Sequence, residues 1–292
     1  MSIHELKNNQ LKVAVSTHGA ELISAQLNDT EYMWDADEHY WARVSPVLFP
    51  FVGGLQGKEY RIDGTSYAME QHGFARDMNF SFSRTSETEM WFSLISDENT
   101  LSRYPYAFEL LIGYEIDGNE LKITWKVKNT DKKTMYFSIG AHPAFLCPPN
   151  DKMDQSDCYL QFDNDTIHYQ KINSEGLFLD AKYNLPLDEQ HAYRIKTTTF
   201  DDDALIVQDG QAHTVSLLTS DKQPYVTVNF EAPLFGLWSP AKKEAPFICI
   251  EPWYGRCDAV GYDGELKDRE YEQTLDAGKT FTASYTITYL PV

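Results

Sequence analysis

Hydrophobic and polar residues alternate at every second position along most of the chain. Successive side chains of a β-strand point to opposite faces, so this period of two predicts half-buried strands. The alternating runs are rich in β-branched and aromatic residues, which strands favour. We expect strands within residues 11–17, 20–28, 79–96 (two strands around a polar turn), 108–130 (a hairpin), 134–145, 166–172, 204–210, 213–219, 225–230, 247–255 and 280–290.

Turn and helix signals are few. Asp117-Gly118 lies at the centre of the 108–130 hairpin and supplies the positive φ that a tight turn needs. Helical periodicity is almost absent; residues 96–105 and 239–246 are each expected to hold a short helical turn that a proline stops. The polar stretch 180–203 is expected to be a loop.

The organisation of these segments indicates a single all-β domain over residues 1–292. The chain contains no repeat of fixed period and no low-complexity linker, and its length suits one large β-fold. So many strands at short spacing predict a mostly antiparallel sandwich or barrel. A nucleotide-binding α/β fold is disfavoured, because no GxGxxG follows a strand and the glycine-rich stretch 49–60 lacks a phosphate-loop ending.

Composition narrows the class of protein. Hydrophobic residues make up 42% of the chain and aromatic residues 14%, enough for a large packed core. The net charge of −19 repels phosphate backbones and anionic membranes, so we expect neither a nucleic-acid nor a membrane partner.

The N-terminus shows no signal-peptide pattern, and no stretch approaches the ~20 apolar residues of a membrane helix. The four cysteines are too few for a disulfide framework and lack zinc-site spacing. We therefore expect a cytoplasmic protein whose thiols are reduced.

Three stretches place one ionisable side chain beside Gly or Pro at the edge of an apolar strand. They are 69–77 with His72, 138–148 with His142, and 247–258 with Glu251. A titratable group at a strand end can face a cleft while its backbone stays rigid.

Of these three residues, Glu251 is the most informative about function, because its apolar neighbours should raise its pKa toward that of a general base near neutral pH. An ion pair between Glu251 and Arg256 is the alternative. Each of the two histidines can instead be a packed residue satisfied by the backbone.

Other chemistries fit the sequence less well. Two histidines and a carboxylate can bind a metal, but no HExxH or similarly tight ligand spacing is present, so we expect neither metal nor cofactor. A serine hydrolase is disfavoured because no GxSxG motif occurs.

Taken together, four stretches resemble the aldose 1-epimerase (galactose mutarotase-like) superfamily, in a bacterial branch close to the hexose-6-phosphate 1-epimerases. They occur in the order of that family, and the similarity extends over nearly the whole chain. The stretches are WARVSPVLFPFVGGLQ (41–56), QHGFARD (71–77), IGAHPAFLCP (139–148) and CIEPWYGRCD (249–258).

The resemblance implies a β-supersandwich, in which large, mostly antiparallel sheets present a concave sugar-binding face. It implies that His72 and His142 are the active-site histidines and that Glu251 is the catalytic carboxylate. Asp203, within a run of three aspartates, falls where the family binds sugar hydroxyls. Arg43 or Arg76 takes the place of the substrate-binding arginine.

The function expected from the resemblance is interconversion of the α and β anomers of a hexose. The C1 hydroxyl loses a proton, to Glu251, while the ring oxygen gains one, from His142; His72 stabilises the developing charge. A partly protonated His142 with a pKa near ~6.5 suits this role. Trp41, Phe74 and Trp253 are candidates to pack against the sugar.

Two alternatives stay open. The substrate can be a hexose 6-phosphate, held by a clamp of cations (Arg43, Lys58, Arg61 and Arg76). The protein can also be a non-catalytic carbohydrate-binding protein on the same fold, which the presence of His72, His142 and Glu251 disfavours.

Overall fold

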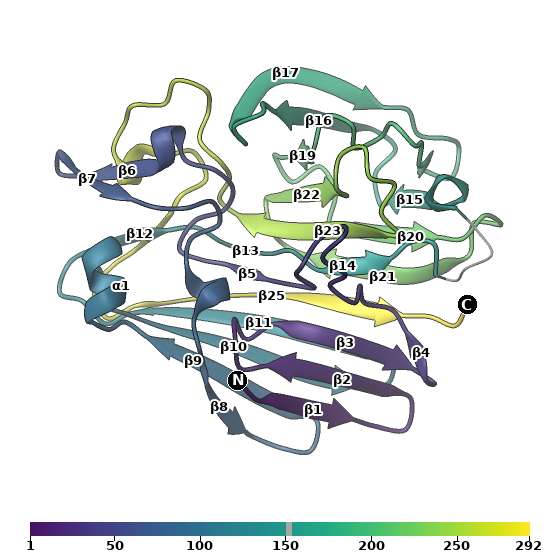
Figure 1. Ribbon diagram of the computed structural model, residues 1–292, viewed down its shortest axis with the longest axis horizontal. Helices are drawn as coiled ribbons and strands as arrows, with labels where there is room; N and C mark the ends of the chain where they lie inside the picture. Colours follow the sequence, from purple (N-terminus) through teal and green to yellow (C-terminus); the bar gives the residue numbers. More distant parts are fainter. Residues whose placement is uncertain (150–153) are drawn as a thin grey trace.

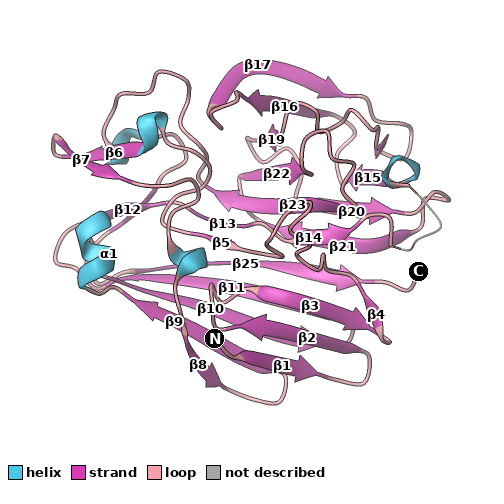
Figure 2. Cartoon of the chain, in the orientation of Figure 1, coloured by secondary structure: helices cyan, strands magenta, loops and turns pink. Residues whose placement is uncertain are grey.

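The computed structural model describes residues 1–149 and 154–292, and almost every element in it is a strand (Figure 2). Two large, mostly antiparallel sheets dominate the fold, which confirms the predicted all-β sandwich (Figure 1). The nine-stranded sheet contains, in spatial order, β18 (Ala192–Arg194), β15 (Tyr159–Phe162), β20 (Thr214–Leu218), β21 (Pro224–Phe230), β25 (Thr280–Tyr289), β11 (Glu120–Asn129), β10 (Phe108–Asp117), β9 (Glu89–Ile95) and β8 (Ser81–Arg84).

The second large sheet has eight strands and carries the candidate site. In spatial order it contains β17 (Phe178–Leu185), β16 (Ile167–Ile172), β19 (Leu205–Val207), β22 (Leu234–Trp238), β23 (Phe247–Tyr254), β13 (Ile139–Ala141) and β5 (Val47–Leu48), with β14 (Ala144–Leu146) also paired to β23.

Smaller sheets complete the strand inventory. A four-stranded sheet contains β1 (Ile3–Lys7), β2 (Leu11–Ser16), β3 (Leu22–Leu27) and β4 (Thr30–Glu31). Two-stranded sheets join β6 (Glu59–Ile62) to β7 (Thr65–Ala68), and β12 (Met135–Phe137) to β24 (Gln273–Leu275).

Helices are short and lie in connections. The expected turn at 96–105 is confirmed as α1 (Glu98–Arg103), where the Asp97 side chain accepts from the Thr100 N–H in a capping box. Segment 239–246 forms turns instead of the expected helix. The described residues also form the 3₁₀ helices η1 (Gln56–Lys58), η2 (Ala75–Asp77), η3 (Gln155–Asp157) and η4 (Leu266–Asp268).

The hairpin of β10 and β11 forms as predicted, with its turn displaced by one residue. Asp117 still pairs with Glu120, so the two turn residues are Gly118 and Asn119, and Gly118 has a φ of 55°. Gly118 therefore supplies the positive φ from the first turn position.

The expected loop over 180–203 is wrong in part, because β17 continues into this range as far as Leu185 and β18 lies within it. All six central residues of β17 are exposed, since it forms the outer edge of its sheet. A strand exposed on both faces has no alternation of polar and apolar residues to reveal it.

The two faces of β23 pack against different surroundings. Ile248 and Ile250 belong to the large core, which also contains residues from the nine-stranded sheet. Cys249, Glu251 and Trp253 point the other way, since side chains alternate along a strand. The period of two therefore places Glu251 on the face of the sheet opposite the main core.

Within the described residues, no helix is both long enough and apolar enough to cross a membrane.

Candidate active site

Strand register places His142 opposite Glu251. Ile139 pairs with Tyr254 across β13 and β23, and Ala144 pairs with Cys249 across β14 and β23. Counting inward from either pair brings residue 142 level with residue 251. Pairing is interrupted at this level, where Pro143 lacks an N–H group, so the His142 side chain can project from the gap.

Two glycines make room for the indole of Trp253 in the same sheet. A Cβ atom on Gly140 would lie 2.6 Å from Cδ1 of Trp253, and one on Gly236 would lie 2.5 Å from its Cη2. The ring thus lies over the backbone of both neighbouring strands and forms a flat wall of the site.

His72 enters the site from a tight turn outside the sheet. Its φ is 66°, and that of Gly73 is 69°. A Cβ on Gly73 would lie 2.4 Å from the backbone oxygen of Phe49, so only glycine allows this approach. A positive φ at a non-glycine residue is a strained conformation that is common at functional sites.

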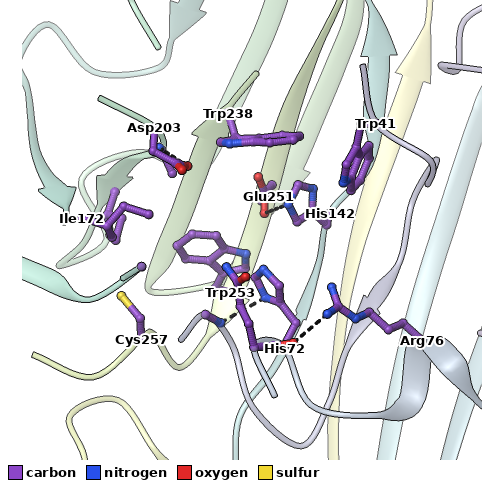
Figure 3. Close-up of a pocket in the computed structure, with 15 residues that line it drawn as sticks. Trp41, His72, Arg76, His142, Ile172, Asp203, Trp238, Glu251, Trp253 and Cys257 are labelled. Carbon is purple, nitrogen blue, oxygen red and sulfur yellow. Dashed lines mark hydrogen bonds and ion pairs between the residues drawn. The ribbon is translucent and has the colours of Figure 1, made fainter. Parts of the chain in front are cut away.

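These segments enclose a pocket with a volume of about 200 Å³ (Figure 3). One water molecule needs only ~10–15 Å³, so the pocket has room for a larger polar ligand. Its lining is Trp41, Gly53, Gln71, His72, Arg76, His142, Ile172, Gly176, Asp203, Ala204, Ile206, Trp238, Glu251, Trp253 and Cys257.

The three expected catalytic side chains converge in this pocket. Nε2 of His142 lies 3.4 Å from Oε2 of Glu251, and the ring centroids of His72 and His142 are 5.6 Å apart. All three are buried, with Glu251 only 1% exposed. Residues far apart in sequence therefore face one another within a single hollow.

Burial sets the protonation of the His142–Glu251 pair. It raises the pKa of Glu251 well above its usual value, and the charge of Asp203 acts in the same direction. Burial, aided by the positive charges of Arg76 and Arg43, lowers the pKa of His142 to about 3. The expected partly protonated His142 is therefore wrong for the sugar-free pocket, where burial favours the neutral form of both groups, with the proton on Glu251.

The hydrogen bonding of His72 fixes its tautomer. The Gly53 N–H donates to Nδ1 of His72 at 3.1 Å, so this nitrogen carries no proton. Burial holds the pKa of His72 well below its usual value, and His142 acts in the same direction. His72 is therefore neutral, with Nε2–H as its donor.

The two candidate arginines occupy different positions. Arg76 lines the pocket, where its guanidinium donates to the backbone oxygen of Gln71 at 2.8 Å. Arg43 lies outside the lining and pairs with Asp77 at 2.8 Å, although its charge still acts on both histidines.

Asp203 is the member of its aspartate run that lines the pocket. It adopts a φ of 73°, and its carboxylate accepts from the Ala204 N–H at 2.8 Å. The neighbouring Asp202 pairs with Lys171 at 2.6 Å and is exposed.

Three alternatives that the sequence left open do not form. The four-cation clamp does not assemble, since Lys58 pairs with Glu70 and Arg61 lines other hollows. Arg256 pairs with Glu270 rather than with Glu251. Phe74 packs against Tyr104 and Phe108 inside the core, away from the pocket.

Aromatic rings surround His142. Trp41 stacks on its imidazole with ring centroids 4.8 Å apart, and Trp238 meets it edge-on at 5.2 Å. Sequence reasoning missed Trp238. The only sign of it in the sequence was a tryptophan at the end of an apolar run. Its closeness to His142 depends on the pairing of β22 with β23.

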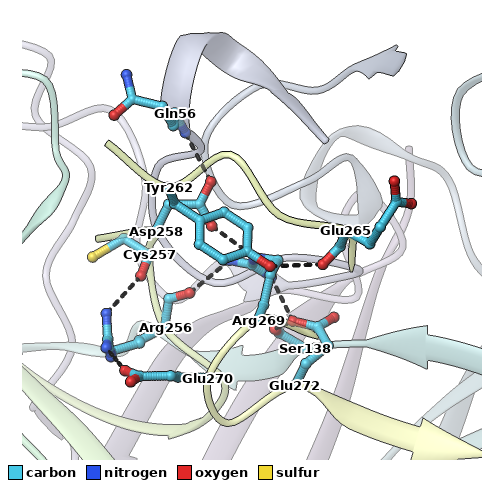
Figure 4. A network of polar contacts seen from close by, with 10 residues as sticks. All are labelled: Gln56, Ser138, Arg256, Cys257, Asp258, Tyr262, Glu265, Arg269, Glu270 and Glu272. Atoms are coloured by element: carbon cyan, nitrogen blue, oxygen red, sulfur yellow. Dashed lines mark hydrogen bonds and ion pairs between the residues drawn. The ribbon is translucent and has the colours of Figure 1, made fainter. Parts of the chain in front are cut away.

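A buried polar network supports the loop behind His72 (Figure 4). Arg269 donates to Asp258 at 2.7 Å and also contacts Glu272, which accepts from Ser138. Asp258 in turn accepts from the Gln56 N–H at 2.8 Å. The network therefore ties segment 256–258 to the 53–56 loop that supplies the hydrogen bond to His72.

The arrangement suits proton transfer at a neutral polar ligand. The buried pair holds one proton and has one free basic site, so a bound hydroxyl can lose a proton to one group while a second oxygen receives one from the other. Aromatic walls and flanking polar groups are typical of carbohydrate sites. Fold and site together have the features of an all-β enzyme whose pocket can support acid–base chemistry on a neutral polar ligand.

Comparison with known proteins gives the family. The family model described as aldose 1-epimerase matches residues 2–271, and the chain belongs to this family. The chromosomal protein LacX of Lactococcus lactis subsp. lactis is 31% identical, over 98% of this chain and 99% of that protein.

Two solved structures share the fold. A galactose mutarotase related enzyme from Lactobacillus acidophilus has a TM-score of 0.93 and 32% identity, covering 99% of this chain and 98% of that one. A galactose mutarotase-like protein from Lactobacillus casei ATCC 334 also has a TM-score of 0.93, with 26% identity and coverage of 99% and 100%. The protein is thus an isomerase with a general aldose epimerase role.

Proposed function

We propose that this protein interconverts the α and β anomers of an unphosphorylated hexose such as galactose or glucose. The observation that carries the proposal is the 3.4 Å approach of His142 Nε2 to Glu251 Oε2 inside a polar, aromatic-walled pocket. Ring opening requires a base at the C1 hydroxyl and an acid at the ring oxygen, and this pair supplies both.

Glu251 acts as the base and His142 as the acid in the proposed mechanism. Because burial leaves the proton on Glu251 in the empty pocket, the proton passes to His142 before the chemical step. Sugar hydroxyls that donate to the carboxylate favour this transfer, since hydrogen bonds to an ionised form stabilise it. The ring then opens, the C1–C2 bond rotates, and closure on the other face returns both protons.

His72 and the charged residues orient the sugar. The Nε2–H of His72 donates to an oxygen of the reacting region, as its tautomer requires. Arg76 and Asp203 bind sugar oxygens at opposite sides of the pocket (Figure 3). Arg43 positions Arg76 indirectly through Asp77, which contacts both guanidinium groups. No cofactor enters this mechanism, and we expect a chelator to leave the rate unchanged.

The charge of the pocket supports an unphosphorylated substrate. Among the described residues of the lining, Arg76 is the one with a permanent positive charge, and Asp203 offsets it. A phosphate dianion is typically bound by several cations in a clamp. Here Lys58 and Arg61, the other members of the expected clamp, lie elsewhere.

The test compares the anomerisation of glucose and galactose with that of glucose 6-phosphate, by polarimetry or NMR exchange. We expect kcat/KM for a free sugar to exceed that for the phosphate by at least about tenfold. The reverse ranking would identify a hexose-6-phosphate 1-epimerase. No acceleration of either class, with retained sugar binding, would identify a non-catalytic carbohydrate-binding protein.

Two further properties belong to the proposal. Residues 1–292 form one domain, because the largest buried cluster draws side chains from both large sheets and from the β1–β4 sheet. The protein acts in the cytoplasm, where its four thiols, free in the structure, stay reduced.

A further inference from the structure

A thiol lies beside the proton-transfer pair and has no part in the proposed chemistry. Cys249 precedes Glu251 by two positions in β23, so its side chain lies on the same face of the sheet. It is fully buried, and Trp41 and Trp238 pack against its cluster. An imidazole nitrogen of His142, the thiol sulfur of Cys249 and a carboxylate oxygen of Glu251 all lie within 4.8 Å of one another.

This trio has the chemistry of a zinc-type ligand set. Nitrogen, thiolate sulfur and carboxylate oxygen are the ligands that Zn²⁺ prefers. In a tetrahedral zinc site, metal–ligand bonds of about 2.0–2.3 Å place the ligand atoms about 3.3–3.8 Å from one another. The three atoms here lie within 4.8 Å, so side-chain rotations that bring them about 1 Å closer complete the site.

An unpartnered polar atom marks the same place. Oε2 of Glu251, which faces Nε2 of His142 at 3.4 Å, is buried and makes no hydrogen bond to the described residues. Buried polar atoms normally have partners, so this oxygen retains unused capacity to bind a ligand. The net charge of −19 raises the local concentration of cations around the molecule.

We propose that His142, Cys249 and Glu251 bind a soft divalent cation such as Zn²⁺, with the fourth coordination position open to the pocket. The ion enters past His142 and Glu251, since both line the pocket and Cys249 lies deeper. On binding, the Cys249 thiol and the Glu251 carboxyl each release a proton to solvent as the sulfur–metal and oxygen–metal bonds form. The bound ion occupies the two groups that transfer protons, so it inhibits the enzyme and competes with the sugar.

Cobalt spectroscopy tests the site without relying on activity. Reduced, chelator-treated protein is titrated with Co²⁺, which reports a tetrahedral site by its visible bands and a thiolate ligand by a near-ultraviolet charge-transfer band. We expect one ion per chain with a thiolate band, and displacement of Co²⁺ by Zn²⁺.

Two matched substitutions decide which sulfur is involved. Cys249→Ser should abolish the thiolate band and weaken Zn²⁺ binding by at least about tenfold; Cys249→Ala serves as a second variant should the serine impair folding. Cys257→Ser is the control, because Cys257 lines the same pocket but lies outside the trio. The proposal is wrong if the wild type shows no thiolate band, if the band survives in both Cys249 variants, or if Cys257→Ser removes it.

The inhibition rests on the proposed function and is measured separately. Zn²⁺ should slow anomerisation by the wild type, EDTA should restore the rate, and Cys249→Ser should need at least about tenfold more Zn²⁺ for the same inhibition. Equal sensitivity of wild type and variant would remove the role of the thiol. If the protein shows no epimerase activity at all, the cobalt result still decides whether the metal site exists.

Discussion

Glu251 is a carboxyl group in surroundings that oppose its ionisation. It is 1% exposed, and Asp203 adds a negative charge nearby. Its partner His142 lies 3.4 Å away and is also held neutral by burial. At the scale of the residue, function depends on which member of this pair holds the proton when the sugar arrives.

Glu251→Gln tests the proposed base. The amide keeps the size of the side chain but cannot accept a proton, so we expect anomerisation to fall by at least about 10²-fold. Polarimetry of freshly dissolved α-anomer measures the rate, and circular dichroism checks that the fold is retained. A rate near that of the wild type would exclude Glu251 as the base.

His142→Asn is the corresponding test of the acid. Asparagine can hydrogen-bond the ring oxygen but cannot donate a proton in exchange, so we expect a loss of about 10²-fold or more in kcat. NMR exchange between anomers measures it. His168→Asn, at an exposed residue of β16, is the matched control and should retain the wild-type rate. A normal rate in His142→Asn would leave the ring oxygen without its proposed proton donor.

At the scale of the element, the site is built from one broken strand pair and one strained turn. The interruption between β13 and β14 lets His142 project toward Glu251. The turn at 72–73 carries His72 to the same pocket, where His72 and Gly53 exchange hydrogen bonds. Just after the turn, the N–H groups of Phe74 and Ala75 donate to the backbone oxygen of Phe49.

Gly73→Ala measures what this turn requires. A positive φ at alanine costs about 1 kcal/mol, and the clash with the Phe49 oxygen should add about 1–3 kcal/mol. Gly64→Ala is the control, because Gly64 has a φ of 77° and a Cβ added there would have no atom within 4 Å. Urea unfolding compares the two; equal losses would show that the approach to Phe49 is not tight.

Arg269→Gln tests the polar network behind the site. It leaves two buried carboxyl groups, Asp258 and Glu272, without their cation, and we expect a loss of about 3–5 kcal/mol in the free energy of unfolding. Arg194→Gln removes a solvent-exposed ion pair to Asp157 and should cost no more than about 1 kcal/mol. Similar losses in both variants would contradict a structural role for the network.

At the scale of the whole molecule, the buried pair makes stability depend on pH. The pKa of Glu251 is raised on folding, so its contribution to stability is fully present below the unfolded pKa and is lost as pH rises through the folded pKa. The lowered pKa of His142 acts oppositely, with stability lost as pH falls from about 6.5 toward about 3. Above about pH 4.5 the two effects oppose each other, so the pair changes stability less than either group would alone.

A comparison of wild type with Glu251→Gln isolates the carboxyl. As pH rises above about 4.5, the wild type should lose stability relative to the variant by up to about 1.4 kcal/mol per pH unit. Urea unfolding at about pH 5, 6 and 7 measures the difference. Parallel stability curves would mean that Glu251 is already ionised in the folded, sugar-free protein.

The alternation of apolar and polar residues was enough to determine the class of fold. It identified β2, β3, β9–β11 and β23, because each buries one face or lies inside the sheets. The same rule missed β17, whose exposed position at a sheet edge leaves no pattern. Residue types beside Gly and Pro also singled out His72, His142 and Glu251.

Only the tertiary structure decided how these residues relate. Strand register set His142 against Glu251 and brought Trp238 and Cys249 beside them, and register is not written in any local pattern. In the folded chain Arg61 lies outside the pocket that Arg76 lines, and Phe74 lies in the core. Local sequence determines which face of a strand a side chain occupies, whereas its neighbours and its proton depend on pairing and burial across the whole chain.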